Sequence, residues 1–516
     1  MVRPSARFFG ASDRRVTRQL EVAAPLLERR STFWAVALLT AVLFAVTNLP
    51  WHLDDYDQAK QAFTSFEMVN DGQWLYQHTP SGKVATKPPL IGWVSAAVYA
   101  VTRSWDAAWR LPSLAAAALL LYALTRTATA SYGIAAGVVV FCAFGLNLLS
   151  PRLATLVRTD MPLALVVFLL GANIWRKVQS GDAWTARDRQ IVFVLLTTAM
   201  LVKGPIVYAF LLPGLVVFQL IGQPKGLRAS PWSGWWPWLA SLAVFVAWVA
   251  AGIAWVPEFY EQVVLKEFAG RFGETVHRPQ PIPFYFPHLL HKFAPWSVLL
   301  IALAAVGWRR EKIGFAARWR RISPATRWLI CWSAGGLLVM SLIPSKRVDR
   351  IFPIIPPLCL LLAAQVGNAW RDETLGPRVR RWSAVAVVFA AVFTTGYAAQ
   401  RMIISYRADE GALARFGTLV RHDAAERGWR YEVVQGKHEG LLLYLQRTRF
   451  IKLDEAMERW NSGTLDAVVV PAEQAQVFQG QVSGAEASPL AGAITQNGRV
   501  RRYVLLVKSS ATPPPQ

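Results

Sequence analysis

Acidic side chains stand at the borders of apolar segments, which is where the surface of a membrane would hold them. Asp54, Asp55 and Asp57 follow the first long apolar segment, and Asp160 in RTDMPL comes directly before a later one. A carboxylate in such a place can accept a proton from an attacking hydroxyl group. Because aspartates at the start of a loop are more often solvated or capping groups, this role depends on the partners that the fold brings to them.

Cationic side chains occupy the same kind of border. Lys87 precedes two prolines in ATKPPL, Lys203 follows an apolar run in MLVKGP, and Lys346 and Arg347 lie in SLIPSKRVDR. A single cation here would simply extend toward lipid headgroups, whereas several together could bind a phosphate leaving group. Further ionisable residues in the same region are Glu67, Arg158, Glu267, His277 and Arg278.

The composition predicts that these borders belong to a membrane protein. Of the 516 residues, 54% are hydrophobic and 17% are charged, and apolar stretches recur between residues 33 and 400. The basic residues behind the net charge of +23 cluster in short linkers, which is typical of cytoplasmic loops and not of a nucleic-acid surface. We therefore predict an all-α polytopic membrane protein with membrane lipids, and no nucleic acid, as partners.

The positive charge also predicts an orientation. The linker from 308 to 327 holds seven Lys or Arg residues, so it should face the cytoplasm. This requires that 89–103 does not cross the membrane but forms a helix at the outer face, beginning at its two prolines. The predicted spans are 33–50, 109–125, 132–150, 160–176, 190–202, 204–221, 235–256, 292–308, 327–343, 351–367 and 382–400.

Three regions follow from this topology. Residues 1–32 form a basic cytoplasmic tail, and 33–400 form the transmembrane domain, with a first outer loop at 51–108 and a large outer loop at 257–291. Residues 401–516 alternate short β-like runs such as LDAVVV with the helical run EGALARFGTLVRHDAAERG. This pattern predicts a small soluble α/β domain, which the topology places on the outer side, with a disordered end at SSATPPPQ.

The first outer loop is predicted to contain an interfacial helix. Ala59, Ala62, Phe63, Phe66 and Val69 follow helical spacing, and a helix with such a face can lie in the plane of the headgroups. The carboxylates, the cations and this helix all fall on one side of the membrane. Together they suit the transfer of a group from a lipid-phosphate carrier, because cations hold the phosphate and a carboxylate assists the attacking group.

An ordered set of motifs between about residues 30 and 400 resembles a known family. The motifs are YDQAKQAFTSFEMVNDGQWLYQHTPSGKVATKPPLIGW, WRLPS, RTDMPL, KGP and SKRVDRIFPIIPPL. They resemble the polyprenyl-phosphate-sugar-dependent glycosyltransferases of the GT-C fold, which include the bacterial aminoarabinose transferases that modify lipid A. Protein O-mannosyltransferases are more distant members. The resemblance implies a GT-C bundle of about 11–13 transmembrane helices.

The resemblance also implies an activity and a place for it. An inverting enzyme would move a monosaccharide from undecaprenyl phosphate to lipid A, another envelope glycan, a lipid or a protein, on the periplasmic face of the bacterial inner membrane. Asp57 and Asp160 match the acidic positions of the family, and Gln58 stands where glutamate is common. The donor phosphate would be bound by Lys87, Lys203, Lys346 and Arg347. The acceptor or sugar pocket would be lined by Glu67, Arg158, Glu267, His277 and Arg278.

Three alternatives stay open at this point. Some GT-C proteins use a divalent metal, and five histidines lie near the outer face: His52, His78, His277, His288 and His291. A secondary transporter would also have about a dozen spans, but it would hold its ionisable groups near the midplane of the bilayer. A sugar-lipid binding protein that has lost its chemistry would keep the fold alone.

Overall fold

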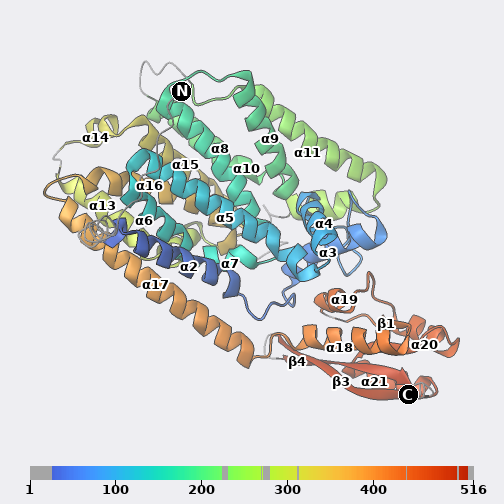
Figure 1. Ribbon diagram of the computed structural model, residues 1–516. Coiled ribbons are helices and arrows are strands. Elements are labelled where there is room, and N and C mark those ends of the chain that lie inside the picture. Colours follow the sequence, from blue (N-terminus) through green and yellow to red (C-terminus); the bar gives the residue numbers. More distant parts are fainter. Residues whose placement is uncertain are drawn as a thin grey trace, which may run out of the picture.

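The computed structural model describes residues 26–223, 230–268, 270, 279–310, 313–436, 438–496 and 499–509. A bundle of helices is joined through one long helix, α17 (Gly376–Arg407), to a small α/β unit that ends the chain (Figure 1). The other helices of the bundle are α2 (Arg30–Val46), α3 (Tyr56–Asp71), α4 (Leu90–Thr102), α5 (Trp105–Tyr132), α6 (Ile134–Gly145), α7 (Ser150–Thr155), α8 (Asp160–Ser180), α9 (Ala186–Lys203), α10 (Ile206–Val217), α11 (Trp235–Trp255), α12 (Tyr285–Lys292), α13 (Trp296–Arg310), α14 (Phe315–Arg321), α15 (Pro324–Leu342) and α16 (Ile355–Trp370), with short turns η1 (Leu26–Glu28), η2 (Phe218–Gly222), η3 (Tyr260–Phe268), η5 (Ile282–Phe284) and η6 (Val348–Ile354).

Helices occupy all of the predicted membrane spans. Within the described residues, six helices are long and apolar enough to cross a membrane, or seven if the bent pair 282–292 and 296–310 is one span. Four shorter apolar helices, which include α2 and α6, lie among them. The expectation of an all-α polytopic membrane protein is confirmed, whereas the expected number of about 11–13 spans stays a prediction.

Helix α4 covers the segment that was predicted not to cross the membrane. Its 13 residues reach about 20 Å, which is short of the roughly 30 Å of a hydrocarbon core. It packs against α3 and α5. Helix α14, in the cation-rich linker, lies at the opposite end of the bundle from α3 and α4 (Figure 1).

Helix α3 buries its apolar face in protein instead of presenting it to lipid headgroups. Ala62, Phe63 and Phe66 are at most 2% exposed and belong to a hydrophobic cluster that includes side chains of α5 and of the C-terminal unit. Sequence spacing identifies such a face, but it does not tell which apolar surface will cover it. The helix is thereby fixed rigidly at the end of the bundle.

The C-terminal unit is built on a four-stranded sheet of order β1–β2–β4–β3. Strands β1 (Tyr431–Val433) and β2 (Ala467–Pro471) are parallel, while β4 (Arg499–Lys508) runs antiparallel to β2 and to β3 (Ala485–Gln496). The helices of this unit are α18 (Ala412–Arg427), α19 (Gly440–Leu445), α20 (Leu453–Asn461) and α21 (Ala472–Gln481). The predicted small α/β domain is confirmed as a fold, although sequence reasoning missed β3.

Helix α19 attaches this unit to the acidic loop before α3. The Tyr444 hydroxyl donates to Asp54 over 3.0 Å and accepts a hydrogen bond from the backbone N–H of Leu53. Gly440 allows the close approach, because a Cβ at this position would lie 2.5 Å from the carbonyl oxygen of Leu53. The C-terminal unit therefore contacts the segment that leads directly to Asp57.

Candidate active site

Segments far apart in the chain meet around one cavity of about 280 Å³ next to the start of α3. Eight cationic side chains and three carboxylates are among the residues that line it. The cavity therefore favours an anionic ligand. The lining residues are Tyr56, Asp57, Lys60, Thr79, Lys83, Val84, Thr86, Lys87, Arg158, Asp160, Lys203, Gln262, Lys266, Arg347, Asp349 and Arg350.

Asp57 is held in the first turn of α3. The side chain of Asp55 caps this helix by accepting a hydrogen bond of 2.8 Å from the backbone N–H of Asp57. The Asp57 carboxylate accepts a hydrogen bond from Arg347 and lies 3.7 Å from Arg158. Burial acts to raise the pKa of Asp57, but Arg347 together with Lys87 and Arg158 more than offsets it and lowers the pKa to about 2. Asp57 is therefore an ionised carboxylate at neutral pH.

Asp160 and Lys203 form a second pair in the cavity. Asp160 is the first residue of α8, and its carboxylate accepts a hydrogen bond from the Lys203 ammonium group. Lys203 is the last residue of α9, which ends because Gly204 adopts a φ of 74° and Pro205 follows it. The KGP motif thus serves to end a helix and leave its terminal lysine beside Asp160.

Arg158 links the acidic groups around the cavity. Its guanidinium group donates to Asp349 over 2.8 Å and to Asp55 over 2.7 Å, and its side chain is 7% exposed. Gln58 supports the same loop, because its amide oxygen accepts a hydrogen bond of 3.2 Å from the backbone N–H of Val157. The residue that departs from the family pattern therefore has a positioning role in this chain.

Lys87 lies in a loop that is tied to α3. The Glu67 carboxylate accepts a hydrogen bond of 2.5 Å from the backbone N–H of His78, and it lies 2.7 Å from the Nδ1 atom of the His78 ring. The Lys87 ammonium group is 3.4 Å from the amide oxygen of Gln61. Burial and the charge of Lys203 lower the pKa of Lys87, Asp57 and Asp160 act against this, and the result is a pKa of about 8.

The cavity gathers six of the residues that the sequence singled out, namely Asp57, Lys87, Arg158, Asp160, Lys203 and Arg347. Two others lie outside its lining. Lys346 donates over 2.8 Å to the carbonyl oxygen of Gln280, and Glu67 binds His78 in the loop before Lys87.

Three predicted residues of the large outer loop are not described. His277 and Arg278 lie outside the described residues, and Glu267 belongs to η3 but its side chain is not described either. Gln262 and Lys266 of the same η3 segment do line the cavity. The predicted roles of these three residues therefore stay predictions.

Sequence reasoning missed several lining residues. Asp349 lies in the quoted SKRVDR motif, two residues after Arg347, and it binds Arg158. Lys60 follows Asp57 by three residues, which is the spacing of neighbours on one helix face. These two signals were present in the sequence. Lys83 lies in a polar loop with no such pattern.

The described residues of the cavity do not resemble a metal site. Asp57 and Asp160 each pair with a cation, whereas metal-ligating carboxylates need to be available to the ion. None of His52, His78, His288 and His291 lines the cavity.

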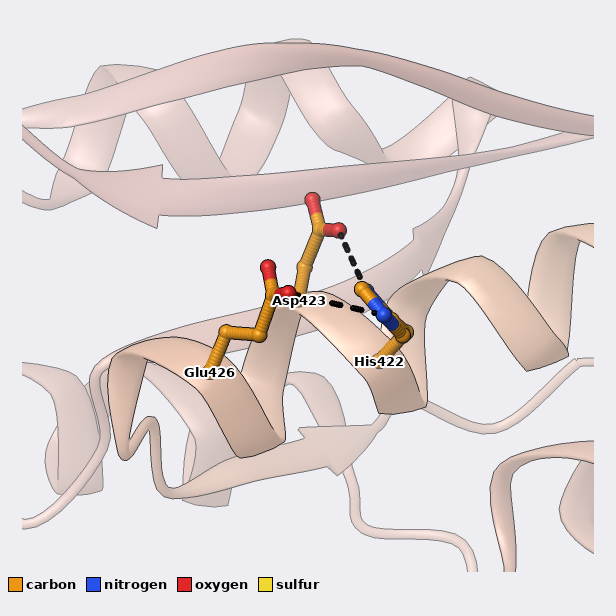
Figure 2. A group of neighbouring side chains, drawn as sticks. All are labelled: His422, Asp423 and Glu426. Carbon is orange, nitrogen blue, oxygen red and sulfur yellow. Dashed lines mark ion pairs between the residues drawn. The ribbon is translucent and has the colours of Figure 1, made fainter.

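A group with metal-like spacing lies elsewhere in the described part of the chain. His422, Asp423 and Glu426 lie together on α18 (Figure 2), where His422 is 3.5 Å from Glu426 and 3.9 Å from Asp423. The His422 side chain is 66% exposed, so this group has the character of an ordinary surface ion pair.

The bundle, the end cavity and the C-terminal α/β unit define a polytopic membrane protein of the GT-C fold. The structure is similar to the crystal structure of ArnT from Cupriavidus metallidurans bound to undecaprenyl phosphate, with a TM-score of 0.66 and 19% identity over 94% of this chain and 98% of that chain. It is also similar to the apo oligosaccharyltransferase of Archaeoglobus fulgidus, with a TM-score of 0.51 and 12% identity over 86% of this chain and 70% of that one. At these identities the likeness establishes the fold.

Two relatives identified by sequence are named as arabinosyl transferases. The chain is 27% identical over 354 residues to undecaprenyl phosphate-alpha-4-amino-4-deoxy-L-arabinose arabinosyl transferase 1 of Sodalis glossinidius, which is 66% of this chain and 60% of that protein. It is 28% identical over 346 residues to the corresponding transferase of Pseudomonas aeruginosa, or 65% and 60%. The chain thus spans about three fifths of these curated relatives. No family model matches. The resemblance inferred from the motifs is confirmed, and nothing favours a transporter.

Proposed function

We propose that this protein is a glycosyltransferase that moves a monosaccharide from an undecaprenyl-phosphate carrier to an envelope acceptor. The observation that carries this proposal is the cavity in which Asp57 and Asp160 lie among an excess of cations. The sequence relatives, which are named as undecaprenyl-phosphate arabinosyl transferases, support the same donor class. The site faces the periplasm of the bacterial inner membrane, because the cation-rich α14 linker lies at the other end of the bundle.

The donor phosphate binds among Lys87, Lys203 and Arg347. Two of these cations already hold carboxylates, Lys203 to Asp160 and Arg347 to Asp57, so they are aimed into the cavity before the donor arrives. Lys87 forms no ion pair within 4 Å with the described residues, so its charge is the most available of the three to a phosphate. Preorganised cations of this kind stabilise a departing phosphate.

Asp57 acts by its charge more than by accepting a proton. A carboxylate with a pKa of about 2 is a weak base at neutral pH, since efficient bases have a pKa near the working pH. Its negative charge can stabilise the positive charge that develops on the sugar ring as the bond to the phosphate breaks. An acceptor phosphate, which is already ionised, would need no base at all.

The step is a single displacement. An acceptor oxygen forms a bond to the anomeric carbon from the face opposite the carrier, and the bond from that carbon to the phosphate oxygen breaks. The electron pair leaves with polyprenyl phosphate, and the departing phosphate oxygen takes up the proton that a hydroxyl acceptor gives up. The configuration at the anomeric carbon is therefore inverted.

The test is a comparison of envelope lipids and glycans by mass spectrometry. Cells that produce the wild-type protein should contain a species heavier by one sugar residue, and cells without the gene should lack it. The mass difference identifies both sugar and acceptor. Uptake of a labelled solute into proteoliposomes without covalent transfer would contradict the proposal and favour a transporter.

A further inference from the structure

A second cavity, of about 570 Å³, lies between α5, α8 and α9 and shares no residue with the candidate active site. Asn173, Trp175 and Arg176, near the end of α8, line one side, and Arg126 of α5 lines another. Asn173 is 13 residues after Asp160 on the same helix, which corresponds to about 20 Å along its axis. The cavity therefore lies toward the other end of the spans.

The lining is rich in hydrogen-bond donors. Arg126 and Arg176 contribute charge, and Asn173 and Trp175 contribute N–H groups. No carboxylate belongs to the lining among the described residues. The carboxylate of Asp188 lies 2.7 Å from Lys177 and 3.9 Å from Arg176, so it is already paired. A ligand that fits this lining must bring acceptors and negative charge.

Two of these donors have no partner among the described residues. The side-chain amide nitrogen of Asn173 and the indole nitrogen of Trp175 are buried and make no hydrogen bond there, and the two residues are 7% and 4% exposed. Buried polar groups in native proteins are nearly always satisfied. Arg126 and Arg176 lie before the last turns of α5 and α8, where the helix dipole acts most strongly, so the dipoles account neither for them nor for the two interior donors.

The rest of the lining is apolar. Leu169, Ala172, Ile191 and Leu195 line the cavity beside the polar groups, and the helices α5 and α8 are both long and apolar enough to cross a membrane. A polar cluster at the end of two spans with an apolar wall beside it suits a molecule with an anionic head and an acyl chain. Basic pockets between helices on the cytoplasmic side bind lipid headgroups in this way.

We propose that this cavity is a binding site for an anionic phospholipid of the leaflet opposite the active site, with the headgroup phosphate bound by Arg126, Arg176, Asn173 and Trp175. The proposal is independent of the transferase activity. In this proposal a phospholipid of the bilayer is a specific ligand of the cavity between α5, α8 and α9.

Native mass spectrometry of the purified, delipidated full chain tests the proposal by titration with phosphatidylglycerol or phosphatidylcholine. We expect phosphatidylglycerol to bind about tenfold more tightly, because charge-assisted hydrogen bonds are the strong ones. Arg126→Gln combined with Asn173→Leu should lower its affinity by about tenfold or more. Trp175→Phe, which keeps the ring and removes the donor, should give a smaller loss of affinity with unchanged thermal stability.

Arg187→Gln is the matched control, because Arg187 is an exposed cation at the start of α9 that does not line the cavity. This variant should bind phosphatidylglycerol like the wild type. Equal binding of the two lipids, or wild-type affinity in both cavity variants, would overturn the proposal. Displacement of phosphatidylglycerol by an equal concentration of inorganic phosphate would also overturn it in favour of a free-anion site.

Discussion

The cavity and the junction with the C-terminal unit lie on either side of one short acidic loop, and they affect their carboxylates in opposite ways. Asp57 in the cavity has a pKa of about 2 because of Arg347, although burial opposes this. Asp54 at the junction has a pKa raised to about 6 by burial, which His52 and the hydroxyl of Tyr444 only partly offset. Burial alone therefore does not predict which aspartate stays ionised; the charge of the partner decides.

Neighbouring aspartates of this loop therefore have different roles. Asp55, between the two, caps α3 and binds Arg158. A loop of three aspartates thus contains one that anchors a domain, one that shapes a helix and one that serves the cavity. Substitutions at Asp57, Lys87, Glu67 and Tyr444 test this division of roles.

The largest effect is expected at Asp57. Asp57→Asn should lower the rate of sugar transfer by at least about 100-fold, because it removes the charge that faces the developing positive charge. Transfer by purified protein with an undecaprenyl-phosphate sugar donor measures this. Asp182→Asn, at an exposed aspartate outside the cavity lining, is the control and should keep wild-type activity. An Asp57→Asn variant with undiminished transfer would remove Asp57 from the mechanism.

We expect that deprotonation of Lys87 limits activity at alkaline pH. With a pKa of about 8 in the free protein, Lys87 is charged below that pH and neutral above it, so kcat/KM should fall as the pH rises through about 8. Lys87→Arg should move this limb to higher pH, because arginine stays protonated. Lys87→Gln should lower kcat/KM by about tenfold or more at pH 7. An alkaline limb that is identical in wild type and Lys87→Arg would assign it to another group.

Glu67→Gln tests whether the loop before Lys87 depends on its tie to α3. We expect a loss of about 1.5–3 kcal/mol in stability, which is typical of a hydrogen bond to a charged group, and a rise in KM larger than the fall in kcat.

The hydrogen bond with Glu67 raises the pKa of His78, although burial opposes it. This contribution to stability is therefore complete at low pH and is lost as the pH rises through the pKa of folded His78. Thermal unfolding at pH 5 and pH 8 should reveal the difference, and it should vanish in the variant.

The smallest effect is expected at the junction. Tyr444→Phe removes the hydrogen bond to Asp54 and the one from the backbone N–H of Leu53, and it should cost about 1–2 kcal/mol, with little change in the intrinsic rate of transfer. Because the pKa of Asp54 is raised from 3.8 to about 6, the folded state binds its proton more tightly, so this aspartate makes stability fall as pH rises from about 4 to about 6. Thermal unfolding across this range measures the slope. An equal slope in Asp54→Asn would show that another group causes it.

The sequence predicted the helical bundle and the ionisable residues at its end better than it predicted which surfaces and side chains contact one another. Apolar length located the spans, and positive charge identified α14 and its linker, because both depend on composition along the chain. The covering of the α3 face by protein could not be predicted, since periodicity gives a face and not its neighbour. Strand β3 was missed because its sequence, AEASPLAGAITQ, is poor in large β-forming residues.

In the candidate site, too, the sequence identified residues but not their contacts. Asp57, Lys87 and Lys203 were identified because they stand in motifs at the borders of apolar runs. Their pairing could not be read from the sequence, because Arg347 and Asp57 are 290 residues apart. Lys346 and Arg347 were assigned the same role, yet consecutive side chains in an extended segment point in opposite directions. Arg347 reaches the cavity, whereas Lys346 binds a backbone carbonyl outside its lining.

The most direct test of the account is thiol labelling of Lys83→Cys, at the exposed edge of the cavity. The three native cysteines are buried, so a membrane-impermeant maleimide should report the new thiol alone. If the cavity faces the periplasm and binds the donor, the reagent should label intact spheroplasts from the outside, and added undecaprenyl phosphate should protect the thiol. Labelling that requires permeabilised membranes, or that undecaprenyl phosphate leaves unchanged, would contradict it.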